Sequence, residues 1–87
     1  MKPLTRGMYA RSLAGHDKGS LFIIVEADDT YVYLSDGRLR PLDKPKKKKR
    51  MHIQPDYDIA DVIREKLETQ KPIRDEDIRK ALKVKEV

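Results

Sequence analysis

The sequence predicts a mainly β fold with an α-helical C-terminal part, a small five-stranded barrel followed by two short helices. Up to Pro55, short apolar stretches alternate with turns rich in glycine and aspartate, and no helical pattern lies between them. After Pro55 the apolar residues recur every third or fourth position instead of every second. We therefore expect residues 1–55 to form the barrel and residues 56–87 to pack on it as part of one folding unit.

The five expected strands are short and are separated by tight turns. The first two flank a loop bracketed by Gly15 and Gly19, and the third forms a hairpin with the second through residues 28–30. Asp36-Gly37 is a strong turn signal, which predicts a fourth strand directly after it. The expected strands cover residues 7–13, 21–27, 31–34, 38–42 and 51–54.

Two amphipathic helices are expected after Pro55. Asp58 is a favourable N-cap, and the apolar residues after it return to one helical face until Pro72 ends the pattern. This places the first helix over residues 58–69. A second helix is expected over residues 75–83, with acidic residues in its first turn. Because both helices are short, their apolar faces are expected to pack on the barrel, on each other or on a partner.

The positive charge of the chain is concentrated before residue 56. Residues 1–55 contain 12 Lys and Arg against 6 Asp and Glu, whereas residues 56–87 contain 8 against 9. Residues 43–50, which contain Lys44 and the run Lys46–Arg50, form an expected mobile linker. Arg38 and Arg40 share one face of the strand before it. Such asymmetry indicates a polyanionic partner. A nucleic acid fits better than a membrane surface because no amphipathic apolar face adjoins the run.

Residues 14–19, Ala-Gly-His-Asp-Lys-Gly, form the most distinctive loop of the sequence. Gly15 and Gly19 allow positive φ angles and close backbone approach, and Asp17 can fix the loop by accepting a hydrogen bond from a backbone amide. Lys18 would then project outward as a candidate phosphate contact. We expect His16 to hydrogen-bond or stack rather than to act as a base.

This loop, residues 9–12 (Tyr-Ala-Arg-Ser) and the run Phe22–Val25 together resemble the KOW motif. KOW motifs occur in small SH3-like barrels of large-subunit ribosomal proteins and of transcription-elongation factors. The resemblance reaches about Pro55, and Ser20 and Leu21 stand where a further basic residue and a glycine are common in that family. It implies an SH3-like barrel that binds RNA, with ribosomal RNA as the expected partner.

The candidate RNA-binding residues lie in this loop and in the basic stretches after it. They are Gly15, His16, Lys18, Gly19, Arg38, Arg40, Lys44, Lys46, Lys47, Lys48, Lys49 and Arg50. Tyr31 and Tyr33, which alternate with Val32 and Leu34, are expected to be half-buried sheet surface, and the alternative is that they stack on unpaired bases. The alternative is a protein-interaction module of the elongation-factor KOW type, which would use the barrel and the helices 58–69 and 75–83 to dock on ribosomal or other proteins.

The composition argues against several other classes of protein. With no cysteine and only two histidines, the sequence offers no metal site, and we find no catalytic constellation. No cofactor or small-molecule substrate is implied. No stretch approaches the ~18 apolar residues of a membrane span, and the first twenty residues contain no apolar leader. We therefore expect a non-enzymatic cytoplasmic protein without a membrane partner.

Overall fold

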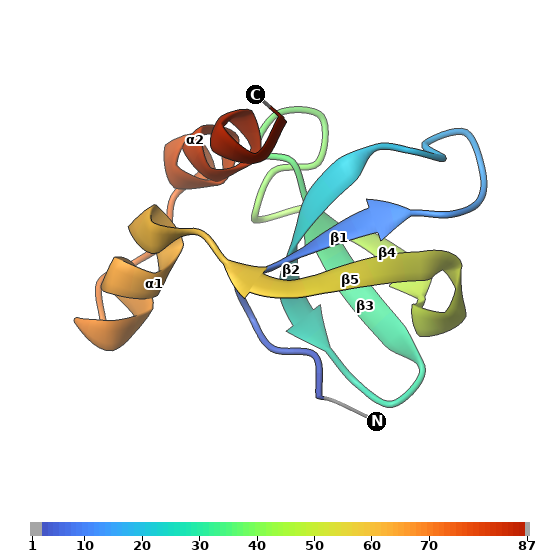
Figure 1. The fold of residues 1–87 in the computed structure, drawn as a ribbon, viewed down its shortest axis with the longest axis horizontal. Helices are drawn as coiled ribbons and strands as arrows, with labels where there is room; N and C mark the ends of the chain where they lie inside the picture. The colour runs from blue at the N-terminus through green and yellow to red at the C-terminus, as the bar shows by residue number, and fades with distance from the viewer. Residues whose placement is uncertain (1–2, 87) are drawn as a thin grey trace.

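The computed structural model describes residues 3–86 and contains a five-stranded antiparallel sheet and two C-terminal helices (Figure 1). In chain order the elements are β1 (Met8–Ser12), β2 (Leu21–Ala27), β3 (Tyr31–Ser35), β4 (Lys46–Lys49), β5 (Ile53–Ile59), α1 (Asp61–Glu68) and α2 (Asp75–Glu86). A 3-10 turn, Arg50–His52, joins β4 to β5. The predicted combination of a five-stranded sheet with two C-terminal helices, and more strand than helix, is therefore confirmed.

The strand order in the sheet is β4-β3-β2-β1-β5. Every neighbouring pair is antiparallel, and irregularities in register occur in the pairing of β1 with β5 and of β2 with β3. Within residues 3–86, β4 and β5 do not pair with each other, so the sheet is not closed by hydrogen bonds.

The central strand β2 is buried on both of its faces over Phe22–Ile24, which explains its apolar run Leu21–Val25. On one face Phe22 and Ile24 belong to a core cluster with Val32 and Leu34 of β3. On the other face Ile23 packs in a second cluster that includes residues of both helices. The expected alternation in β3 is also confirmed, because Val32 and Leu34 are fully buried while Tyr31 and Tyr33 are only partly buried.

Both helices cover this second face of the sheet, at the left of the view in Figure 1. Ile63 of α1 and Ile78 and Ala81 of α2 are buried there with Tyr9. The Tyr9 hydroxyl donates a hydrogen bond of 2.7 Å to the carbonyl oxygen of Ala81. Burying one isoleucine side chain is worth about 1.5–3 kcal/mol, so the helices add substantially to the core of a chain this small.

The structure corrects the expected fourth strand and the expected linker. Residues 38–42 do not form a strand but lie in an irregular loop, and Asp36-Gly37 begins that loop instead of a hairpin. Lys46–Lys49, expected to be a mobile linker, is strand β4 and pairs with β3. A lysine run gives no local strand signal, and the tertiary pairing with β3 overrides that local preference.

The last strand and the helix boundaries also differ from those expected. β5 covers Ile53–Ile59 rather than residues 51–54, so the expected division after Pro55 falls inside a strand. Because β5 keeps pairing with β1 as far as Ile59, α1 starts at Asp61 rather than 58. Its N-cap is Ala60, which makes no side-chain capping hydrogen bond, so Asp58 does not have the expected role. α2 continues to Glu86, beyond the expected end at residue 83.

Candidate functional site

The loop between β1 and β2, residues 13–20, is called the glycine loop below. Gly15 and Gly19 have φ angles of +85° and +90°, which confirms the expected left-handed backbone. The Lys18 amide donates to the carbonyl oxygen of Gly15 at 3.2 Å, and the Ser20 amide donates to that of Asp17 at 2.9 Å. These turns leave the side chains of His16 and Lys18 exposed at the tip, and neither makes a hydrogen bond or ion pair with the described residues.

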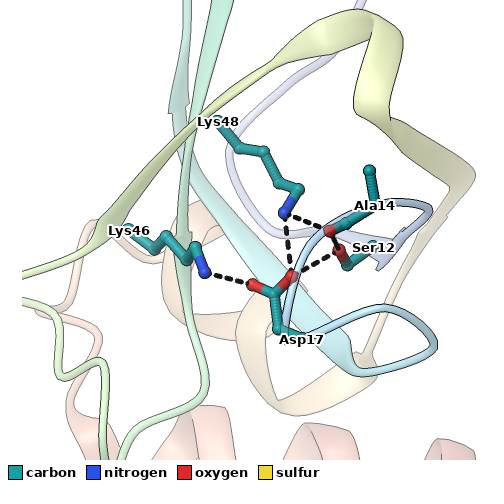
Figure 2. Close-up of polar contacts among 5 residues, drawn as sticks. All are labelled: Ser12, Ala14, Asp17, Lys46 and Lys48. Atoms are coloured by element: carbon teal, nitrogen blue, oxygen red, sulfur yellow. Dashed lines mark hydrogen bonds and ion pairs between the residues drawn. The ribbon is translucent and has the colours of Figure 1, made fainter.

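The Asp17 carboxylate attaches the glycine loop to β4, as Figure 2 shows. Its Oδ1 accepts hydrogen bonds from the Ser12 hydroxyl at 2.7 Å and from Lys48 Nζ at 2.8 Å. Lys46 Nζ lies 2.6 Å from Oδ2, and Lys48 Nζ also donates to the carbonyl oxygen of Ala14 at 2.7 Å. We call these five residues the Asp17 cluster. Asp17 fixes the loop as expected, but through a hydroxyl and two ammonium groups instead of a backbone amide.

The hydrogen bonds within the Asp17 cluster determine the charge state of the Asp17 carboxyl group. Burial alone would raise the pKa of the Asp17 carboxyl, but hydrogen bonds from Lys46, Lys48 and Ser12 hold that pKa far below its ordinary value. The carboxylate is therefore ionised throughout the physiological pH range. Since it is paired with Lys46 and Lys48, these two lysines hold the glycine loop in place and offer less free charge than the sequence suggests.

The other two lysines of β4 lie on the opposite face of the strand, next to the tyrosines of β3. Lys47 stands across from Tyr33 in the register, and its Nζ lies 4.1 Å from the centre of the Tyr31 ring. Lys49 stands across from Tyr31 and is exposed. A cation over an aromatic face is attracted by the ring quadrupole. This tyrosine–lysine face combines two aromatic rings with two cations on one side of the sheet.

Arg50 belongs to a different part of the molecule from the glycine loop. It begins the 3-10 turn, and its backbone amide donates to the carbonyl oxygen of Thr30 at 2.9 Å. Its guanidinium Nη1 donates to the carbonyl oxygen of Asp28 at 2.8 Å. Arg50 is thus attached to the turn between β2 and β3, and the structure does not bring it to Lys18.

Arg38, Arg40 and Lys44 lie in the loop between β3 and β4, residues 36–45, called the arginine loop below. Asp36 Oδ1 accepts hydrogen bonds from the backbone amides of Arg38 and Arg40, both at 2.9 Å. The three basic side chains are exposed and make no ion pair within residues 3–86. Arg38 and Gly19 line the same hollow of about 450 Å³, so the two loops approach each other there.

Two arginines outside the candidate set hold these loops. Arg11 Nη1 donates to the carbonyl oxygen of Gly19 at 2.6 Å, and Arg79 Nη1 of α2 donates to that of Gly37 at 2.7 Å. Arg79 is 42 residues from Gly37, so no local sequence signal could have identified this contact. For Arg11 the only available signal is its outward position in a strand that leads into the glycine loop.

Comparison with protein-family models and with curated proteins gives no match for this chain. Within residues 3–86 there is no group of three or more acidic or histidine side chains arranged to hold a metal ion. The two helices of that part of the chain are too short and too polar to cross a membrane.

Proposed function

We propose that this chain is a non-enzymatic RNA-binding protein that contacts the phosphate backbone through the glycine loop, the arginine loop and β4. The observation that carries the proposal is the Asp17 cluster. It joins a left-handed glycine loop with an exposed lysine at its tip to a strand made only of lysines. The cluster thus holds the loop that presents Lys18 against β4. Ribosomal RNA is the proposed partner because of the KOW-like sequence. A protein bound to ribosomal RNA would be located in the cytoplasm, which is therefore the proposed location.

The strand order supports the SH3-like barrel that this resemblance implies. The last strand returns to lie beside the first, and a 3-10 turn precedes it. Register irregularities in two strand pairs are the kind of feature that lets a short sheet curve strongly. We therefore treat the sheet as a partly open barrel whose outer surface carries the binding residues.

Five cations of the candidate set supply the proposed phosphate contacts. Each has an exposed side chain without a hydrogen bond, ion pair or aromatic contact to the described residues, unlike Lys47, which lies over the Tyr31 ring. They are Lys18, Arg38, Arg40, Lys44 and Lys49. Unpaired cations on a surface can approach phosphates without first breaking an internal contact, and such contacts position RNA without reading its sequence.

The salt dependence of RNA affinity tests this mechanism. With five phosphates neutralised, log K for a labelled RNA hairpin should fall against log[salt] with a slope of roughly −3.5 to −4.5. Fluorescence anisotropy between 50 and 250 mM salt, at approximately six concentrations, measures that slope. The Lys18→Ala variant should reduce it by about 0.7–0.9. A slope near zero at measurable affinity contradicts a phosphate-directed mechanism.

Sedimentation of the native protein tests the ribosomal assignment separately. On a sucrose gradient at low salt it should travel with ribosomal particles, and high salt should release it because the contacts are electrostatic. Sedimentation at the top of the gradient under both conditions contradicts ribosome association but leaves RNA binding to be judged from the anisotropy.

The alternative function, a protein-interaction module, draws on a hollow of about 740 Å³ beside the helices. Val84 of α2 lines it and is 73% exposed. The apolar residues most central to the helices, Ile63 and Ile78, are however buried against the sheet and are not available to a partner. Because these side chains pack on the sheet, the helix faces support protein docking less well than the exposed cations support RNA binding.

A further inference from the structure

A second hollow, of about 730 Å³, lies where the N-terminal arm, the β2–β3 turn, the 3-10 turn and β5 meet. Leu4, Met51 and Pro55 provide apolar surface in it. Met51 is 75% exposed in a chain in which 40% of the residues are charged. The volume of the hollow lies within the range of about 300–1,000 Å³ typical of sites for small ligands. Exposed apolar surface of this kind indicates a binding site.

The backbone of β5 is distorted at this hollow. Ala10 pairs with Pro55 and Met8 with Ile59, so three residues of β5 face a single residue of β1. Tyr57 lies in this bulge, adopts a φ angle of +54° and is 40% exposed. A bulge redirects the side chains of its strand. A left-handed backbone is energetically unfavourable for a tyrosine, and residues with such strained backbones are often found at functional sites. The bulge places Tyr57 among the residues that line the hollow.

Polar groups of two kinds stand around the apolar surface. Lys49 and Arg50 supply positive charge, while Asp29 and Thr30 supply hydrogen-bond acceptors. Lys49 is also one of the five cations assigned to phosphate above, so the hollow adjoins one of the proposed phosphate contacts. The cations match a phosphate, the apolar surface matches the face of a base, and the acceptors match the donor groups on the edge of a base.

We propose that this hollow receives one unpaired nucleobase of the bound RNA. The base packs on Met51 and Tyr57, its phosphate lies against Lys49, and the Asp29 carboxylate accepts a hydrogen bond from an exocyclic amino group. Single-stranded RNA is commonly recognised through unstacked bases packed on protein side chains. The inference rests on the proposed function, because it names what the RNA presents to one part of the same surface.

The Asp29 carboxylate gives the site a base preference. Cytosine and adenine carry an exocyclic amino group that donates to an acceptor, whereas uracil presents a carbonyl oxygen at the corresponding position. A carboxylate beside that oxygen leaves two acceptors facing each other, which disfavours uracil. The hollow should therefore prefer cytosine or adenine to uracil.

Three eight-nucleotide probes of equal charge test the proposal: oligocytidylate, oligouridylate and an abasic ribose-phosphate strand. At one low salt concentration, oligocytidylate should bind about fivefold more tightly than oligouridylate and more tightly still than the abasic strand. Met51→Ala should weaken oligocytidylate binding about fivefold and leave the abasic strand unchanged. Asp29→Asn should remove most of the difference between cytosine and uracil, because an amide offers both a donor and an acceptor.

The matched control is Val84→Ala, which removes another exposed apolar side chain but lies on α2, outside this hollow. It should change no affinity, and equal urea midpoints for all variants show that each remains folded. Equal binding of the three probes, with no effect of Met51→Ala, would overturn the base site while phosphate binding stands. If none of the three probes binds at low salt, the proposed function itself is overturned.

Discussion

The glycine loop and the arginine loop both depend on a glycine with positive φ, but for different reasons. At Gly19 an added Cβ would meet nothing within 4 Å, whereas at Gly37 it would lie 2.6 Å from the carbonyl oxygen of Asp75. The glycine loop is held by β4 through Asp17, and the arginine loop is held by α2, beside it in Figure 1. One glycine therefore meets a requirement of backbone shape, and the other allows a helix to approach closely.

This difference shows how the helices influence the candidate binding surface. Arg38 and Arg40 project from a loop whose position depends on α2, while Lys18 projects from a loop that depends on the sheet. A substitution that destabilises the packing of the helices should therefore disorder the arginine loop before the glycine loop. The following predictions test that separation.

Ile78→Ala should have the largest effect. The side chain is 1% exposed, and its Cβ would lie 3.2 Å from a Cβ added at Gly37. Removing a buried isoleucine side chain costs about 2–5 kcal/mol, which urea unfolding measures. Hydrogen exchange should become faster at the amides of Arg38 and Arg40 and stay unchanged at the amide of Ser20. Equal acceleration in both loops contradicts the separate attachment.

Alanine at the two glycines should give the next largest effect and compares them directly. Gly37→Ala combines left-handed strain with displacement of the α2 backbone and should cost about 2–4 kcal/mol of unfolding free energy. Gly19→Ala introduces only the strain and should cost about 1 kcal/mol. Urea unfolding of both variants at neutral pH measures the difference. Equal losses would show that Gly37 is not a packing position.

Asp17→Asn should cost about 2 kcal/mol, because the ammonium group of Lys48, whose side chain is 9% exposed, loses its carboxylate partner. The pKa of Asp17 is lowered in the folded protein, so its contribution is fully present above the unfolded-state pKa of about 3.9. That contribution is lost as the pH falls below this value. Urea unfolding at several pH values should show the difference between wild type and variant shrinking on acidification. A difference independent of pH contradicts this assignment.

Lys18→Ala should lower RNA affinity by about 1 kcal/mol, and Lys49→Ala should give the smallest effect, below that of Lys18→Ala. Both side chains are exposed and without ion pairs within residues 3–86, so they form a matched pair. Lys18 stands on a loop fixed by the Asp17 cluster, and less ordering entropy is lost when it meets a phosphate. Anisotropy at one salt concentration measures both affinities. Equal losses would mean that the glycine loop adds charge but no positioning.

The first three strands could be predicted from local sequence because each signal was local. Alternation in β3 separates Val32 from Tyr33, and Asp28 closes the turn before it by accepting from the amides of Thr30 and Tyr31. The positive φ angles of Gly15 and Gly19 also follow from residue type. The helices were located by their periodicity, and only their ends were misplaced.

The structure of β4 could not be predicted because it depends on residues far away in the chain. Lys48 is 31 residues from Asp17 in the sequence. The residues next to Lys48 in the sequence do not indicate that its side chain is one of the less exposed lysines. Four consecutive lysines resemble a solvated linker until their pairing with β3 is known. The division of this run into two structural lysines and two on the tyrosine–lysine face is therefore a property of the fold.

The position of β4 at one end of the strand order has a consequence for solubility. One side of its backbone pairs with β3, and among the described strands nothing pairs with the other side. Such an edge can add a strand from a second molecule, and lysines are a common protection because two copies repel each other. RNA that neutralises these lysines would remove the repulsion. Self-association should therefore depend on the ratio of RNA to protein, and the same charges both attract RNA and prevent edge-to-edge pairing.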